Sequence, residues 1–211
     1  MRPEEIEKES FKIIAHEAGN HGFNREEWKV VRRVIHTSAD FEYLKSIRLH
    51  KDAISLGVSA ILAGKSIVTD TEMARSGIRK RELSSFGCNL VCLIGDPAVK
   101  AQAERTEGTR AETAVDMSIE EMEGGIYVVG NAPTALLRLL YHVKNGAAKP
   151  ALIIGLPVGF VNAAESKAAL VESGYPHISN VGRKGGSNVA ASVLNALILM
   201  AWESSSIKEA R

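Results

Sequence analysis

The residue of this sequence with the clearest capacity for acid–base chemistry is His36, which follows Arg32 and Arg33. Histidine titrates near neutral pH, so it can pass a proton under physiological conditions. Arg33 and His36 share one face if the segment is helical, and a nearby guanidinium favours the neutral imidazole, which can act as a base. Asp40 and Glu42 could orient the ring, although neither has a decisive spacing. A lone histidine in a helix is more often a packing or capping residue, so the rest of the chain must decide.

A second segment, residues 182–188, has the composition of an anion-binding loop. Arg183 and Lys184 precede two glycines and Ser187, at the expected start of a helix. Free N–H groups and the helix dipole favour negative charge at such a place. The order of residues differs from that of a nucleotide-binding P-loop, and turn formation alone is the competing interpretation.

Three further polar residues are candidates for binding a charged ligand. Arg75 opens a basic run that continues at residues 79–81, and this run could hold carboxylates or form a solvated face. Lys167 lies near the start of an expected helix, where it could equally hold a surface pair. Asn131 directly follows an expected strand.

Helices and strands alternate along the chain and must position these residues. The first third is expected to form helices at Pro3–Ala18, from the N-cap Asn24 (with Glu27 as its capping-box partner) to about Ser38, and at Lys51–Ala63. Short apolar runs predict strands at Ser66–Thr69, Leu90–Ile94, Ile126–Val129, Ala151–Ile154 and His177–Val181. The remaining helical patterns cover Thr71–Arg75, Ala98–Arg105 with Ser118–Glu123, Pro133–Lys144, Asn162–Ser173 and Ser187–Trp202.

Apolar strands that alternate with helices imply a mostly parallel sheet covered on both faces. We therefore predict a three-layer α/β/α, flavodoxin-like fold with a five-stranded, mostly parallel sheet and extra N-terminal helices. No repeat or linker interrupts the chain, so residues 1–211 are expected to form a single domain. Ligands of such sheets bind beyond the carboxyl ends of the strands, and that is where the Gly- and Pro-containing loops of this sequence are expected.

Composition excludes several classes of function. The formal net charge of +1 and an aromatic content of 5% argue against a general nucleic-acid binder. The polar start of the chain does not resemble a signal peptide, and the apolar run Ala190–Trp202 is too short to cross a membrane, so we expect a cytoplasmic protein. The cysteines and histidines do not form a metal-like set, and no metal site is predicted.

Five ordered motifs make the sequence similar to the precorrin-8X methylmutase family, whose anaerobic counterpart is cobalt-precorrin-8 methylmutase. The resemblance runs from Ile6 to about Trp202. The motifs are Arg32-Arg33-Val34-Ile35-His36-Thr37, Asp70-Thr71-Glu72-Met73-Ala74, Gly130-Asn131-Ala132-Pro133-Thr134-Ala135-Leu136, the segment from Gly155 through Glu165 to Lys167, and Gly182-Arg183-Lys184-Gly185-Gly186-Ser187.

The resemblance implies an isomerase of cobalamin biosynthesis that moves a methyl group from C-11 to C-12 of the contracted tetrapyrrole, giving hydrogenobyrinate or cobyrinate. It implies that His36 is catalytic and that Ser10 and Arg33 contact the substrate. The substrate carries many carboxylates, so basic and polar residues are expected around it. The substrate-binding set expected here is Ser10, Arg33, Thr37, Arg75, Asn131, Lys167, Arg183, Lys184 and Ser187.

The resemblance also implies the cofactors and partners. An isomerisation needs no redox cofactor, and any cobalt arrives inside the tetrapyrrole substrate. Asp40-Phe41 after the histidine motif looks like the anaerobic, cobalt-containing branch, whereas the aerobic enzymes tend to have Cys-Gly there. The family forms dimers, so a homodimer is expected, with no nucleic acid or membrane as partner.

Two other functions stay open at this stage. A non-catalytic tetrapyrrole carrier on the same fold would bind product without changing the spectrum of the substrate. An unrelated enzyme with a phosphate-bearing ligand would use residues 182–188 and bind nucleotides, although the usual phosphate motifs are missing.

Overall fold

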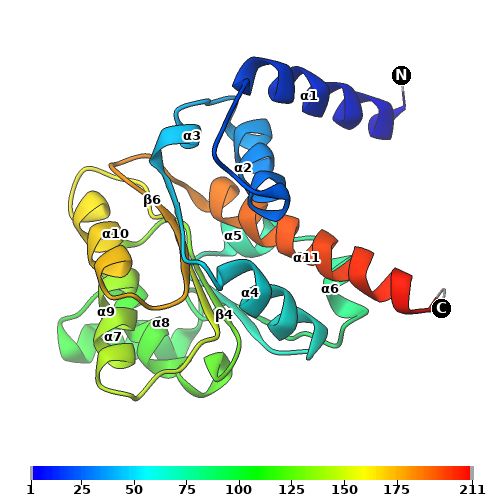
Figure 1. The fold of residues 1–211 in the computed structure, drawn as a ribbon. Coiled ribbons are helices and arrows are strands. Elements are labelled where there is room, and N and C mark those ends of the chain that lie inside the picture. Colours follow the sequence, from blue (N-terminus) through cyan, green and yellow to red (C-terminus); the bar gives the residue numbers. More distant parts are fainter. Residues whose placement is uncertain (1, 210–211) are drawn as a thin grey trace.

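The computed structural model describes residues 2–209, and a six-stranded sheet forms their centre (Figure 1). The strands are β1 (Ile47–Leu49), β2 (Ile67–Thr69), β3 (Leu90–Val91), β4 (Ile126–Val129), β5 (Leu152–Gly155) and β6 (His177–Asn180). They lie in the order β1-β6-β5-β4-β2-β3. β1 pairs with β6 in antiparallel orientation, and all other neighbours are parallel.

The sequence predicted five strands, which is one too few, because the edge strand β1 was missed. This strand has three residues, of which only Ile47 is buried, so it carries no periodic signal of its own. It exists because its backbone pairs with β6, with Ile47 opposite Asn180 and Leu49 opposite Ile178. A pairing between segments so far apart in the chain is not visible in a local pattern.

The helices alternate with these strands and are numbered in chain order. They are α1 (Pro3–Ala18), α2 (Arg25–Ser38), α3 (Tyr43–Ser46), α4 (Ala53–Leu62), α5 (Glu72–Gly77), α6 (Lys80–Ser84), α7 (Pro97–Thr106), α8 (Arg110–Met117), the 3₁₀ helix η1 (Glu120–Met122), α9 (Pro133–Lys144), α10 (Ala163–Glu172) and α11 (Ser187–Glu209). No helix within residues 2–209 is long and apolar enough to cross a membrane.

Successive side chains of the strands lie on opposite faces of the sheet and are buried in two different cores. Ile126 and Val128 of β4 pack in a core with α2, α4 and α11, whereas Tyr127 and Val129 pack in a second core with α8, α9 and α10. Figure 1 shows α11, in red, crossing the first face beside α2 and α4. Burial on both faces explains why β4 and β5 were apparent as continuous apolar runs.

Several helices differ from the sequence prediction. The short helices α3 and α6 were missed, and the helix expected at Ser118–Glu123 is only the 3₁₀ turn η1. The helix of this region, α8, begins earlier because Thr109 caps it: the Thr109 hydroxyl accepts the N–H of Glu112, and the Glu112 carboxylate accepts the N–H of Thr109. The Thr109–Glu112 pair has the spacing of a capping box, but the sequence prediction did not place a helix start there.

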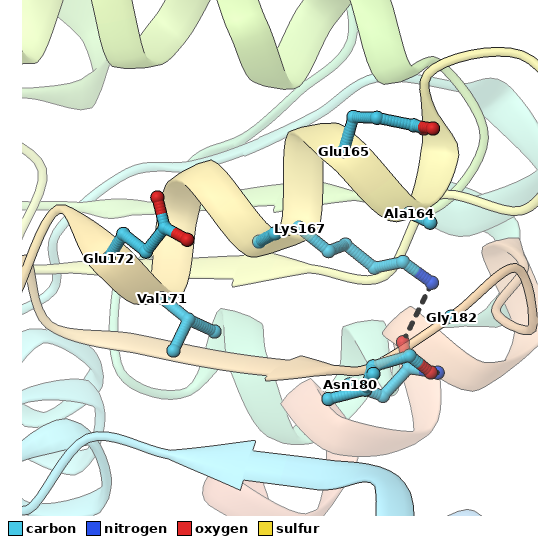
Figure 2. A pocket seen from close by; sticks show the side chains of 9 residues that line it. Ala164, Glu165, Lys167, Val171, Glu172, Asn180 and Gly182 are labelled. Carbon is cyan, nitrogen blue, oxygen red and sulfur yellow. Dashed lines mark hydrogen bonds between the residues drawn. The ribbon is translucent and has the colours of Figure 1, made fainter.

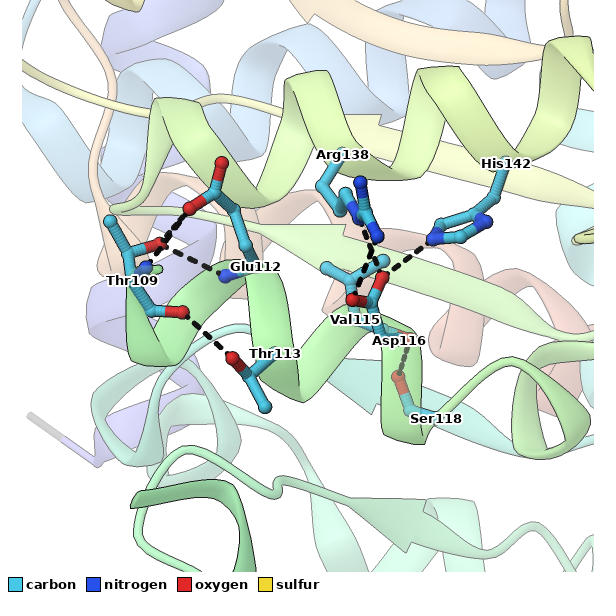
Figure 3. A network of polar contacts seen from close by, with 8 residues as sticks. All are labelled: Thr109, Glu112, Thr113, Val115, Asp116, Ser118, Arg138 and His142. Carbon is cyan, nitrogen blue, oxygen red and sulfur yellow. Dashed lines mark hydrogen bonds and ion pairs between the residues drawn. The ribbon is translucent and has the colours of Figure 1, made fainter. Parts of the chain in front are cut away.

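A polar network joins α8 to α9 on the second face of the sheet (Figure 3). Asp116 accepts hydrogen bonds from Arg138 Nε at 2.6 Å and NH2 at 3.0 Å, and its Oδ1 lies 2.6 Å from His142 Nε2. Arg138 and His142 are four residues apart and therefore reach the same carboxylate from one helix face. The network fixes the two helices against each other.

Candidate active site

Helix α2 carries His36, and capping interactions define both of its ends. The Asn24 side chain accepts hydrogen bonds from the backbone N–H groups of Glu26 and Glu27. The Glu27 carboxylate in turn accepts a hydrogen bond from the Asn24 N–H, which confirms the predicted capping box. At the other end Ala39 adopts a left-handed conformation and donates its N–H to Ile35 at 2.7 Å. The helix therefore ends at Ser38, two residues after His36, as the sequence indicated.

His36 lies in the last turn of α2 with its side chain exposed, directly after the buried Ile35. Its ring meets Phe11 of α1 edge to face, with the centroids 5.2 Å apart. We call the adjoining hollow the His36 cavity; it has a volume of about 300 Å³ and is lined by Ser10, Ile13, Ile14, Glu17, Ile35, His36, Ala39 and Phe41. Two predicted site residues, Ser10 and His36, thus share one cavity.

Phe11 is the contact that joins the histidine to both arginines. The Arg32 guanidinium carbon lies 4.1 Å from the centre of the Phe11 ring, and that of Arg33 lies 5.3 Å away. Such contacts fix the cations over the aromatic face. Phe11 was not among the site residues predicted from the sequence; its position beside Ser10 was the available signal.

The two arginines differ in their hydrogen-bond and ion-pair partners. Arg33 NH1 pairs with Glu7 Oε1 at 3.1 Å, and the Arg33 side chain is 14% exposed. Arg32 Nε is buried without a hydrogen-bond partner. Burial, with Arg33 as a second cause, lowers the pKa of the Arg32 guanidinium below its ordinary value. The two guanidinium groups thus place two cations against the aromatic ring that His36 also contacts.

The loop that follows β6 reaches the segment behind His36. Lys184 Nζ lies 2.6 Å from Asp40 Oδ2 and 2.5 Å from Glu42 Oε2; we call these two contacts the Lys184 bridge. The hydrogen bond from Lys184 lowers the pKa of Asp40, and the two carboxylates raise that of Lys184. The carboxylates considered as partners for the His36 ring are thus both bound to Lys184.

Lys167 is buried more completely than the sequence indicated. Its side chain is fully enclosed, and its Nζ donates to Asn180 Oδ1 at 3.0 Å (Figure 2). A second hydrogen bond runs from Nζ to the Lys184 carbonyl at 2.5 Å. Burial lowers the pKa of this ammonium to about 8. A cavity of about 450 Å³ lies beside it, between α10 and the end of β6. The alternative of a surface pair for Lys167 is excluded by this burial.

The loops after β2 and β4 are joined by Asp70, which comes directly after β2. Its carboxylate accepts the N–H groups of Gly130 at 3.0 Å, Asn131 at 2.7 Å and Ala132 at 2.9 Å. Burial raises the pKa of Asp70, and these three bonds oppose that shift. Gly130 also lies so close to α11 that a Cβ there would be 2.6 Å from Ser187 Cα.

The remaining predicted residues lie in separate surroundings. Ser187 Oγ is 2.9 Å from Thr71 Oγ1, and the Arg183 guanidinium carbon is 5.4 Å from the ring centre of the exposed Phe160. Arg75 pairs with Glu72 within α5. Thr37 is exposed beside His36. Within residues 2–209 no group of three His, Cys, Asp or Glu side chains is placed to hold a metal ion.

Comparison with known proteins gives a consistent result. The family model described as Precorrin-8X methylmutase matches residues 5–200. Cobalt-precorrin-8 methylmutase of Priestia megaterium is 46% identical over 201 residues, covering 95% of this chain and 89% of the relative. Precorrin-8X methylmutase of a Sinorhizobium species is 39% identical, covering 91% and 92%. The crystal structure of the Thermus thermophilus precorrin-8x methyl mutase superimposes with a TM-score of 0.90 at 46% identity, covering 95% of this chain and 97% of that one.

Proposed function

The chain belongs to the precorrin-8X methylmutase family, and we propose on this premise that His36 is the proton donor and acceptor of its reaction. The protein is an isomerase of cobalamin biosynthesis that acts on precorrin-8. The single observation that supports His36 is its position: an exposed imidazole that lines a cavity and contacts Phe11, the same ring against which the guanidinium groups of Arg32 and Arg33 lie.

The role of His36 follows from what a methyl shift requires. An isomerisation conserves atoms and electrons, so a proton that the imidazole accepts while the methyl group migrates must be returned before the product leaves. Phe11 fixes one edge of the ring and leaves the rest exposed to the cavity. A neutral imidazole has one nitrogen that accepts a proton and one that donates it, so a histidine held in this way can take up the proton and return it.

Substrate carboxylates are proposed to bind around this cavity. Arg33 and Ser10 are the first candidates, because Arg33 shares Phe11 with His36 and Ser10 lines the same cavity. Thr37, beside the histidine, extends this set. Asn131, Arg183, Lys184 and Ser187 follow the carboxyl ends of strands, where a large ligand could extend. Arg75 stays the weakest candidate, since it is already paired within its own helix.

We propose a homodimer in which the second subunit completes the site. The His36 cavity, at about 300 Å³, has the volume expected for a small ligand, whereas a tetrapyrrole is much larger. An open site beside an exposed histidine is consistent with a further wall supplied by a partner. A monomer by light scattering would contradict this part of the proposal.

The cobalt-containing form is the proposed substrate. Asp40 and Phe41 distinguish this chain from the pattern of the aerobic enzymes, and both have structural roles: Asp40 binds Lys184, and Phe41 lines the His36 cavity. Identity does not separate the two forms, because a cobalt-precorrin-8 methylmutase and a precorrin-8x methyl mutase are each 46% identical to this chain, so the choice rests on Asp40 and Phe41. Cobalt is cargo of the substrate in this account.

We also infer that residues 1–211 form one flavodoxin-like domain of three layers. In chain order the five parallel strands β2 to β6 lie as 2-1-3-4-5, which is the flavodoxin order. Helices cover both faces of this sheet, and one sheet serves both cores. A cytoplasmic location stays a prediction from the sequence.

Turnover separates the enzyme from a tetrapyrrole carrier. Purified protein is incubated with cobalt-precorrin-8, and the visible spectrum is followed in time with substoichiometric protein. Catalysis predicts the spectrum of a corrin in amounts that exceed the protein many times. A spectrum that changes by no more than one equivalent, despite tight binding of added cobyrinate, would favour the carrier.

A further inference from the structure

Lys167 is a buried cation that forms no ion pair with a carboxylate among the residues that the structure describes. The side chain is fully buried on α10, beside a cavity lined by Ala164, Ala168 and Val171. Glu165 and Glu172 also line this cavity, but neither carboxylate is a hydrogen-bond partner of Lys167. Its two hydrogen-bond acceptors are an amide oxygen and a backbone carbonyl rather than a carboxylate. Burial of an ammonium without an acidic partner is costly, so the position needs an explanation beyond packing.

The Lys184 carbonyl is the point on which two buried donors converge. Lys167 Nζ reaches this oxygen at 2.5 Å, and Asn180 Nδ2 reaches it at 2.9 Å. Lys167 also donates a hydrogen bond to Asn180 Oδ1 (Figure 2), so Lys167, Asn180 and the Lys184 carbonyl are joined in one network. The backbone of Lys184 is therefore fixed from the α10 side.

The side chain of Lys184 forms the Lys184 bridge with Asp40 and Glu42. Asp40 stands between Ala39 and Phe41, and both of these neighbours line the His36 cavity. A shift of Lys184 would thus move the wall of the cavity that holds His36.

We infer that Lys167 is a positioning residue of the methylmutase site, which acts through the Lys184 carbonyl and the Lys184 bridge on the cavity wall at Ala39 and Phe41. The inference rests on the proposed function of His36. It assigns Lys167 no contact with the substrate, because its ammonium is enclosed and its position is determined by two protein acceptors.

A double-mutant cycle tests the inference. K167M removes the ammonium and keeps an apolar stem, and K184M removes the bridge. Each single variant should lower kcat/KM by about 10-fold, mainly through KM, because each loses hydrogen bonds to a charged group that shapes the cavity. The double variant should also lose about 10-fold, since the two residues act in series. A loss of about 100-fold would mean independent action and would overturn the inference.

Hydrogen exchange supplies a readout that does not depend on turnover. K167M should speed exchange of the amides of residues 182–186 and also those of residues 40–44, with α9 unchanged. K184M should speed exchange only in residues 40–44. Faster exchange in α10 alone, with residues 40–44 unaltered, would contradict the inference. The variant K100M, at an exposed lysine of α7, is the matched control and should resemble the parent protein.

The two failures can be distinguished. If the parent protein does not turn over cobalt-precorrin-8, the proposed function fails, whereas the exchange experiment still decides whether Lys167 and the Lys184 bridge are coupled. If the parent protein is active and the cycle is additive, only the Lys167 inference fails. Should K167M not fold, K167Q replaces it in both experiments, because its shorter amide cannot reach the Lys184 carbonyl as the ammonium does.

Discussion

The rings of His36 and Phe11 meet edge to face, with centroids 5.2 Å apart and an angle of 67° between the planes. This contact joins α2 to α1, and the same aromatic ring lies against the guanidinium groups of Arg32 and Arg33. One phenyl group therefore contacts the proposed proton carrier His36, the proposed anion-binding Arg33 and the neighbouring Arg32.

Replacement of Phe11 should consequently affect catalysis more than stability. F11L keeps much of the apolar volume and loses the aromatic contacts, each of which contributes about 0.5–1.5 kcal/mol. We expect kcat/KM to fall by about 10-fold or more, as measured by the rate of corrin formation. F86L is the control, because Phe86 packs edge to face on Trp202 outside the His36 cavity. Equal losses in both variants would speak for a general packing effect.

Glu7 should compete with the substrate for Arg33. Its carboxylate pairs with Arg33 NH1 at 3.1 Å, so E7Q frees the guanidinium for a carboxylate of the ligand. Partly exposed ion pairs contribute up to about 1 kcal/mol, so affinity for cobyrinate should rise by up to about 5-fold in titrations. E9Q alters the neighbouring pair with Lys12 on the same helix and should leave affinity unchanged. Weaker binding by E7Q would show that Glu7 orients Arg33 for the ligand.

Asp70 should be among the most important residues for stability. Its buried carboxylate accepts three backbone N–H groups, and D70A would leave all three without a partner. We expect a loss of about 3–5 kcal/mol in the free energy of unfolding, measured by denaturant titration. D70N retains one acceptor oxygen and should lose less. A loss below about 1 kcal/mol in D70A would mean that water or a backbone shift satisfies these groups.

The Asp116 network predicts a dependence of stability on pH. Burial raises the pKa of Asp116, but the hydrogen bonds from Arg138 and His142 outweigh it, so the folded-state pKa is lowered. The stabilisation is therefore fully present above the unfolded-state pKa, about 3.9, and disappears as the pH falls through the folded-state value.

D116N should measure that contribution. Asp116 is partly exposed, so solvent screening limits the effect at pH 7 to about 1 kcal/mol. The difference between D116N and the parent protein should shrink toward pH 3, as followed by thermal unfolding. E104Q, at an exposed position of α7, should show no such trend. A difference that stays constant with pH would contradict the assignment.

The parts of the fold that the sequence predicted are those with strong local signals. The capping box at Asn24 and the apolar runs of β4 and β5 located α2 and the centre of the sheet to within a residue or two. The three-residue strand β1 was missed because only its pairing with β6 defines it. The site likewise depends on contacts between distant segments. The resemblance to the methylmutase family implied that Ser10 and His36 lie close together, whereas their spacing in the sequence did not.

The contacts that complete the candidate site join distant parts of the chain. Lys184 meets Asp40 across 144 positions, and Arg33 meets Glu7 across 26. The burial of Lys167 likewise depends on β6 and the loop after it. A basic residue near a helix start looks the same in sequence whether it is solvated or enclosed, so only the tertiary structure separates these cases.

If His36 carries the proton of the methyl shift, the H36A variant should lose turnover. Corrin formation from cobalt-precorrin-8 is measured for H36A and for H16A, which alters an exposed histidine of α1 outside the His36 cavity. Circular dichroism and cobyrinate affinity verify that both variants fold and bind. Loss of turnover by about 100-fold or more in H36A, with H16A unaffected, is the predicted result. Turnover at the parent rate in a folded H36A protein would contradict the account.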